Sequence, residues 1–154
     1  MISLKMDFTM RNLSIPVNIW NKNKNRFEET DALFDTGAHT SAIDTTVLLN
    51  LGYDLGGAEK SYIATASSSL ETAHRVRIDK IILDETPLAD VLFNTFAFPI
   101  MSSSVIIGMN IIRQFEVTMN FKSKLITMRE NYLTEDDDYY YDAKIFGDWR
   151  AENI

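Results

Sequence analysis

Cysteine is absent from this 154-residue chain, and histidine occurs only twice, at His39 and His74. Without cysteine, the protein has no disulfide framework, no zinc–thiolate site and no thiol nucleophile. A histidine-based metal site or a Ser-His-Asp triad would have to be built almost entirely from that one pair of histidines. These absences remove several common classes of enzyme from consideration.

Long apolar runs, glycine and proline are also scarce. No apolar segment approaches the roughly 20 residues that cross a bilayer, so we expect no membrane association. The first seven residues, MISLKMD, lack the basic and apolar segments of a secretory signal peptide. We therefore expect a cytoplasmic protein. Six glycines and three prolines exclude collagen-like and low-complexity chains.

Basic side chains are too few and too scattered to bind nucleic acid. The formal net charge is −7, and residues 130–154 alone contain eight acidic and two basic side chains. Residues 1–129 are almost neutral, so neither part has a basic stripe for a phosphate backbone. The same change in composition predicts a folded domain over 1–129 and an acidic, aromatic extension over 130–154.

Short apolar runs separated by turn-forming residues dominate the first 129 residues. Leu13, Ile15, Val17 and Ile19 alternate with Asn12, Ser14, Pro16 and Asn18, which is the period of a half-buried strand. Other predicted strands cover 32–34, 76–81, 91–98 and 105–107, and a closing hairpin joins 115–121 to 125–128. Helical signals are limited to 45–51, capped by Asp44, and 110–114. This pattern predicts an all-β sandwich or closed barrel with one or two short helices.

The segment with the clearest chemical content is Asp35-Thr36-Gly37-Ala38, which follows the apolar run Ala32-Leu33-Phe34. A strand here delivers a carboxylate to its end, and Gly37 allows the next residues to turn sharply. The simpler interpretation is a β-turn in which Asp35 only accepts backbone amides. A second segment makes the β-turn interpretation weaker. Val105, Ile106 and Ile107 form a branched apolar run that ends at Gly108, and Asn110 follows two residues later.

Together these segments resemble the retropepsins, the retroviral-type aspartic proteases, and their relatives in retroelements and bacteria. The resemblance covers roughly residues 10–129. It includes a hairpin over 62–71 in the place of the flap that closes over substrate. The flap residues predicted to contact substrate are Ala64, Thr65, Ala66, Ser67 and Ser68. Leu33, Ile63, Val105 and Ile107 are candidates for pocket walls or core.

The resemblance implies a single-lobed acid-protease fold that works as a homodimer. Only one Asp-Thr-Gly occurs, and the reaction requires two facing carboxylates, so Asp35 of each copy would contribute one. The dyad would activate a water to hydrolyse a peptide or protein substrate, without a metal, a cofactor or a covalent intermediate. Thr36 would hold the carboxylates coplanar across the dimer, and Gly37 would meet the substrate backbone.

Two departures from the retroviral pattern occur together. Retroviral enzymes often have an aspartate after the Asp-Thr-Gly-Ala run and an arginine after the downstream glycine, and these form an ion pair. His39 and Met109 occupy those places here, so neither charge is left without its partner. This replacement indicates the branch outside retroviruses. His39 has two interpretations, a substrate contact or an ordinary turn residue, and His74 is predicted to be structural.

Alternatives to the protease hypothesis remain at this stage. The same fold could serve as a non-catalytic peptide-binding or dimerisation module, or as an enzyme whose only substrate is itself or one cognate protein. The extension over 130–154 has three interpretations: a solvated acidic tail, a segment docked on the body or the dimer mate, or a segment in the cleft.

Overall fold

The computed structural model describes residues 2–5, 13–64, 70–83, 85–99 and 103–145. The strands, in chain order, are β1 (Ile2–Lys5), β2 (Ser14–Asn21), β3 (Arg26–Phe34), β4 (Ala42–Asp44), β5 (Glu59–Ala64), β6 (Leu70–Leu83), β7 (Thr86–Phe96), β8 (Val105–Ile107), β9 (Phe115–Asn120), β10 (Leu125–Glu130) and β11 (Lys144–Ile145). The helices are α1 (Thr45–Asn50), α2 (Met109–Ile112) and a 3-10 turn, η1 (Tyr140–Asp142).

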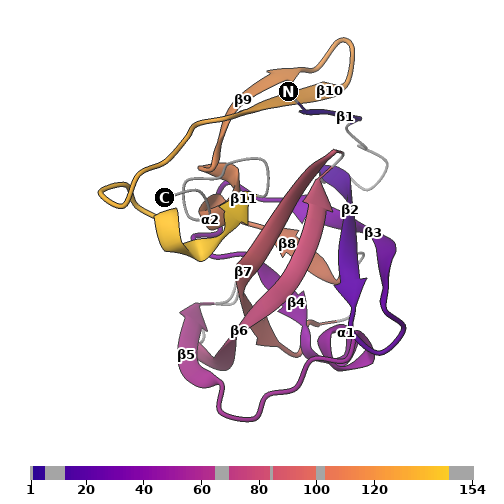
Figure 1. The fold of residues 1–154 in the computed structure, drawn as a ribbon, viewed down its shortest axis with the longest axis vertical. Helices are drawn as coiled ribbons and strands as arrows, with labels where there is room; N and C mark the ends of the chain where they lie inside the picture. Colours follow the sequence, from indigo (N-terminus) through magenta and orange to yellow (C-terminus); the bar gives the residue numbers. More distant parts are fainter. Residues whose placement is uncertain (1, 6–12, 65–69, 84, 100–102, 146–154) are drawn as a thin grey trace.

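Six strands close into a barrel, which confirms the predicted fold class. The order is β7-β4-β8-β3-β2-β6, and β6 then pairs with β7 to complete the ring (Figure 1). Strands β5 and β11 extend the sheet through β6 and β7. The barrel interior is filled by apolar side chains with no exposed surface, including Ile15, Ile43, Ile78, Phe93 and Ile107. Burying these side chains is the main favourable term in folding.

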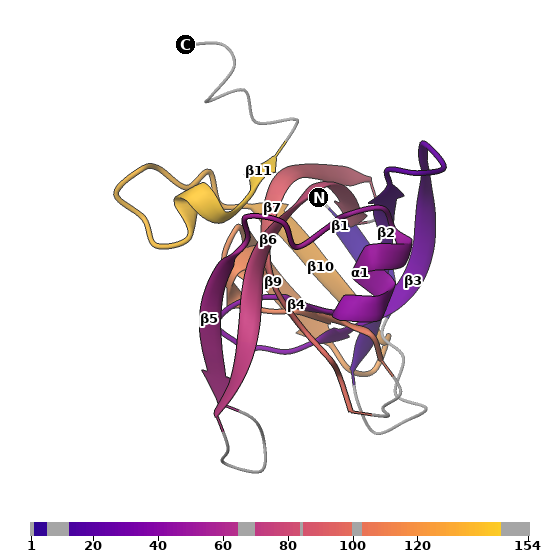
Figure 2. The same ribbon diagram turned by 90° about the horizontal axis from the view of Figure 1, so that it is seen from below.

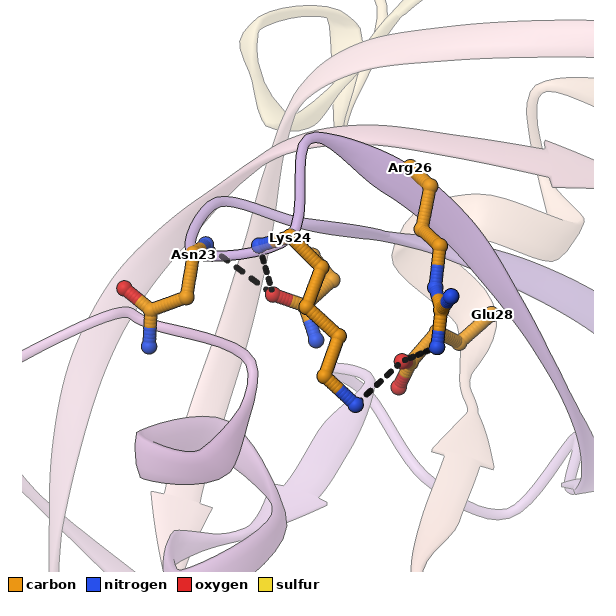
Figure 3. A network of polar contacts seen from close by, with 5 residues as sticks. Asn23, Lys24, Arg26 and Glu28 are labelled. Carbon is orange, nitrogen blue, oxygen red and sulfur yellow. Dashed lines mark hydrogen bonds and ion pairs between the residues drawn. The ribbon is translucent and has the colours of Figure 1, made fainter.

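The hairpin of β2 and β3 shows how the alternating sequence becomes a half-buried sheet. Every second residue of β2 is buried, as its sequence predicts. At the turn, Oδ1 of the buried Asn21 accepts hydrogen bonds from the backbone N–H groups of Asn23 and Lys24, at 2.9 and 3.0 Å (Figure 3). On the outer side, Glu28 lies 3.5 Å from both Lys24 and Arg26. These exposed pairs add little stability, so the Asn21 turn sets the hairpin.

Both predicted helices are present, each close to its predicted bounds. Asp44 caps α1, because its carboxylate accepts from the N–H groups of Thr46 and Val47. The chain leaves α1 through Gly52, whose φ of +91° suits glycine. The second helix, α2, begins and ends earlier than the predicted 110–114. No helix in the described part of the chain is long and apolar enough to cross a membrane.

A three-stranded antiparallel sheet lies at one end of the barrel (Figure 1). Its central strand is β10, paired with β9 on one side and β1 on the other. The β9–β10 hairpin was predicted, whereas β1 was not. Ile2 and Leu4 alternate with Ser3 and Lys5, so a local signal for a strand is present at these residues. Their partner β10 lies 120 or more positions away, and the local pattern does not give that pairing.

The chain after β10 returns to the barrel wall. The Gln114 side-chain amide donates to the Tyr139 carbonyl at 2.7 Å, and the Arg77 guanidinium donates to the Tyr141 carbonyl at 2.9 Å. Strand β11 then pairs with β7 at Leu88 and Ala89. Residues 139–145 are therefore docked on the body, and residues 146–154 lie outside the described part. The domain boundary near residue 130 stays a prediction.

Candidate active site

Strand β3 ends at Phe34, and Asp35 follows directly. The backbone N–H of Asp35 donates to the Ile107 carbonyl of β8 at 2.9 Å, so the residue is fixed to the neighbouring strand. Its carboxylate oxygen Oδ1 accepts from the N–H of Gly37 at 2.8 Å. The side chain is only half-buried, and the Thr36 and Gly37 that follow are exposed. The loop thus presents a carboxylate at the surface while its backbone is held by the barrel.

Strand order explains why the loop after Asp35 is so tightly held. Strand β8 lies between β3 and β4, parallel to β3 and antiparallel to β4. The chain from β3 to β4 must therefore pass around the end of β8, where Gly108 lies. A Cβ atom on Gly108 would come within 2.8 to 2.9 Å of backbone atoms of Thr40, Ala38 and Ser41. Only glycine allows this close approach of two backbones.

Asn110 holds the same loop from inside the molecule. Its Oδ1 accepts from the backbone N–H of Ser41 at 2.8 Å and from the Ser41 hydroxyl at 2.7 Å. The Asn110 amide nitrogen donates to the Leu92 carbonyl at 2.8 Å. The Ser41 hydroxyl in turn accepts from the N–H of Gly108 at 2.9 Å. Ser41 and Asn110 are fully buried, so this network links the loop, β7 and α2 away from water.

Two backbone hydrogen bonds join the start of α2 to the Asp35 loop. Each involves one of the two residues that depart from the retroviral pattern, Met109 and His39. The N–H of Met109 donates to the Ala38 carbonyl at 2.7 Å, and the N–H of Asn110 donates to the His39 carbonyl at 3.1 Å. The exposed His39 ring has its Nδ1 3.4 Å from the Tyr139 hydroxyl. The loop is thus attached to the helix without a charged pair at these two places.

A cleft of about 1040 Å³ opens above Asp35. This volume is slightly above the usual range for ligand pockets. The lining residues are Leu33, Asp35, Gly37, Ala38, His39, Thr40, Ala42, Ser61, Tyr62, Ile63, Glu71, Arg75, Asn94, Phe96, Ala97, Phe98, Pro99 and Ile106. The cleft thus collects residues from the Asp35 loop, the β5–β6 hairpin and the end of β7.

The structure separates the predicted site residues into three groups. Asp35, Gly37, Ala38 and Ile106 line the cleft, as do Leu33 and Ile63. Ile107, Gly108 and Asn110 lie behind the loop and support it, and Val105 is core. Thr36 is exposed in the loop but is not part of the cleft wall.

The predicted flap corresponds to the hairpin of β5 and the first part of β6. Its register pairs Ala64 with Leu70 and Ile63 with Glu71, and the hairpin extends beyond the barrel (Figure 2). Ala64 ends β5, whereas the predicted contact residues Thr65, Ala66, Ser67 and Ser68 lie outside the described residues. Tyr62, which is 73% exposed, lies on the hairpin and lines the cleft.

Several lining residues were not predicted from the sequence. Arg75 comes from β6 and Asn94 from β7. Phe96 ends β7 and Phe98 follows it, and their ring centroids lie 4.6 Å apart. The alternation of β6 and β7 places these residues on strands. Their position beside Asp35 depends on the pairing of distant strands. No group of three or more potential metal-binding side chains occurs in the described part of the chain.

Comparison with known protein families identifies the fold. Residues 23–114 match the model of the family described as "gag-polyprotein putative aspartyl protease". The chain belongs to this family. The match includes the Asp35 loop, the β5–β6 hairpin and the Gly108–Asn110 segment, which are the three parts on which the retropepsin resemblance was based. A comparison with curated proteins gives no match.

Two solved structures of retropepsin-like proteins share the fold of this chain. A retropepsin-like aspartic protease from Rickettsia conorii aligns over 82% of this chain and 87% of its own, with a TM-score of 0.56 and 14% identity. The retroviral protease-like domain of Ddi1 from Leishmania major aligns over 82% and 97%, with a TM-score of 0.51 and 18% identity. At these identities the likeness concerns the fold.

Proposed function

We propose that this retropepsin-like chain is an aspartic endopeptidase that acts as a homodimer. The observation that carries the proposal is the position of Asp35. Asp35 lines a cleft of about 1040 Å³, and its loop lies within the residues that match the family model. A cytoplasmic location belongs to the same proposal and rests on the sequence alone.

The dimer follows from the number of carboxylates that the reaction needs. One chain contains one Asp-Thr-Gly, and a single lobe brings only one such aspartate to the cleft. A two-fold axis beside Asp35 would place the same loop of a second copy opposite the first. Thr36 and Gly37, exposed in one chain, are available for that contact.

The chemistry of such a pair is general acid–base catalysis. Two carboxylates in contact do not both ionise at low cost, so they share one proton. The ionised Asp35 takes a proton from a water held between the two, and the protonated Asp35 donates to the scissile carbonyl. The water attacks, and the amide nitrogen is protonated as it leaves. The β5–β6 hairpin would close over an extended peptide and exclude bulk water.

The test is Asp35→Asn, which keeps the shape of the side chain and removes its acid–base function. Proteolysis of an unfolded protein or a peptide library, measured from acid to neutral pH, is expected to disappear. The unfolding midpoint and the mass of the dimer in solution are expected to stay the same.

Asp54→Asn is the matched control for that test. Asp54 accepts from the N–H of Gly56 at 2.9 Å, the same local turn as at Asp35, but it does not line the cleft. Asp54→Asn is expected to retain full activity. Cleavage by pure Asp35→Asn protein contradicts the proposal. Peptide binding by the wild-type protein without any cleavage supports the non-catalytic binding module instead.

A further inference from the structure

The cleft wall contains both apolar and polar side chains. Leu33, Ile106 and the two rings of Phe96 and Phe98 provide apolar surface around Asp35. A separate group of polar side chains comes from the region where β5, β6 and β7 run side by side: Ser61, Arg75 and Asn94. The proposed function gives Asp35 its role and leaves this polar group without one.

Strand register places the three polar side chains together. Arg75 pairs directly with Asn94 of β7, and directly paired residues point to the same face of a sheet. The Ser61 hydroxyl donates to Oδ1 of Asn94 at 3.2 Å. The backbone N–H of Asn94 is fixed by the Ser41 carbonyl at 2.8 Å, so the group is attached to the end of the Asp35 loop. Its position relative to Asp35 is therefore set by the barrel.

Arg75 carries the positive charge of this group and is weakly paired within the chain. Its guanidinium lies 3.8 Å from Glu59, and the side chains are 50% and 73% exposed. Ion pairs of this kind contribute little, because water screens both charges. Glu71 lines the same cleft. Asp142 interacts with Arg75 electrostatically: burial raises the pKa of the Asp142 carboxyl, whereas the charges of Arg77 and Arg75 lower it.

We propose that Arg75 is a specificity-determining residue that selects substrates with an acidic side chain at the subsite formed by Ser61, Arg75 and Asn94. This inference rests on the proposed protease function. The preferred substrate combines apolar side chains next to the scissile bond with one aspartate or glutamate farther along the peptide. A carboxylate from the peptide replaces Glu59 as the partner of Arg75.

Two physical reasons favour a carboxylate over a neutral group in this subsite. The guanidinium fork binds both oxygens of a carboxylate at once, which fixes its geometry as well as its charge. A bound peptide also covers the half-exposed Arg75 and removes water, so the same charge pair gains strength that the open Glu59 pair lacks. Ser61 and Asn94 supply further polar contacts beside the carboxylate.

The experiment uses the dimeric wild-type protein and sets of peptides that differ at one position by Glu, Gln or Lys. At one position of the peptide, kcat/KM is expected to be about tenfold higher for Glu than for Gln, and lower again for Lys. A hydrogen bond to a charged group is stronger than a neutral one by roughly 1.4 kcal/mol, which corresponds to this tenfold change. The preference for Glu is expected to appear mainly in KM and to weaken as salt is added.

Substitution of Arg75 separates its role from a general effect of charge. Arg75→Glu is expected to reverse the preference toward Lys, and Arg75→Gln is expected to make kcat/KM for the Glu peptide equal to that for the Gln peptide. The matched control is Lys60→Glu, which changes the charge equally on the neighbouring strand β5 at an exposed residue outside the cleft wall. Lys60→Glu is expected to keep the preference for Glu.

The outcomes distinguish this inference from the proposed function. Cleavage without charge preference, or a preference for Glu that survives in both Arg75 variants, overturns the role of Arg75 and leaves the protease function intact. Absence of cleavage of every peptide by the wild-type protein overturns the protease function, and the specificity with it. Unfolding midpoints of the variants show whether any loss comes from misfolding.

Discussion

Replacing Asn110 by alanine tests whether the buried network behind Asp35 holds the active-site loop. The substitution removes three hydrogen bonds of 2.7 to 2.8 Å. It leaves the Ser41 N–H and the Leu92 carbonyl without their partner, and the Ser41 hydroxyl without its acceptor. A buried polar group that loses its partner costs about 1–3 kcal/mol. Some relaxation of the hydroxyl is expected, so the total is about 3–5 kcal/mol, a large part of the stability of a domain this size.

The assay is urea unfolding followed by tryptophan fluorescence, at one fixed protein concentration because dimerisation contributes to stability. Asn131→Ala is the matched control. The exposed Asn131 donates one hydrogen bond, to the Arg113 carbonyl at 3.2 Å. This control is expected to change stability by no more than about 0.5 kcal/mol. If Asn110→Ala costs less than about 1 kcal/mol, the network is not what holds the loop, and the reasoning fails.

Two further predictions follow from the same region. Gly108→Ala is expected to lower the free energy of unfolding by about 1–3 kcal/mol and to reduce proteolysis, because the new Cβ meets three backbone atoms. The control is Gly56→Ala, whose Cβ would meet only the Asp54 side chain, and it is expected to change stability and proteolysis little. Asp142→Asn is expected to raise the unfolding temperature at about pH 7. Burial raises the pKa of the Asp142 carboxyl in the folded state above its pKa in the unfolded chain. The folded state therefore loses stability as the pH rises and this carboxyl ionises, and asparagine removes that loss. The gain is expected to vanish at about pH 3, where the carboxyl is protonated in both states, and an equal gain at both pH values would contradict this account.

The Asp35 loop and its support could be recognised from the sequence because their chemistry is local. An apolar strand, an aspartate and a glycine stand next to one another, and the Gly108–Asn110 segment has its own apolar signature. The alternation of β2 and the Asp44 cap of α1 likewise depend on neighbouring residues, and both were predicted.

Residues that depend on pairing between distant strands could not be placed in the same way. Arg75 resembles any exposed arginine on an amphipathic strand until its pairing with Asn94 brings it to the cleft. Tyr139 lies in an acidic segment for which docking was one of three interpretations, and its contacts with Gln114, His39 and Arg113 show that it docks. Register and long-range packing decide these features, and neither is a local property of the sequence.

Mixing wild-type and Asp35→Asn chains at a constant total concentration tests most directly whether catalysis needs two copies of Asp35. Hybrid dimers contain one intact carboxylate and are inactive if the dyad is required. With random exchange of subunits, an equal mixture is expected to retain roughly a quarter of the wild-type activity, because only that share of dimers has both aspartates. Retention of about half the activity, in direct proportion to the wild-type chains present, would show that each copy acts alone and would contradict the account.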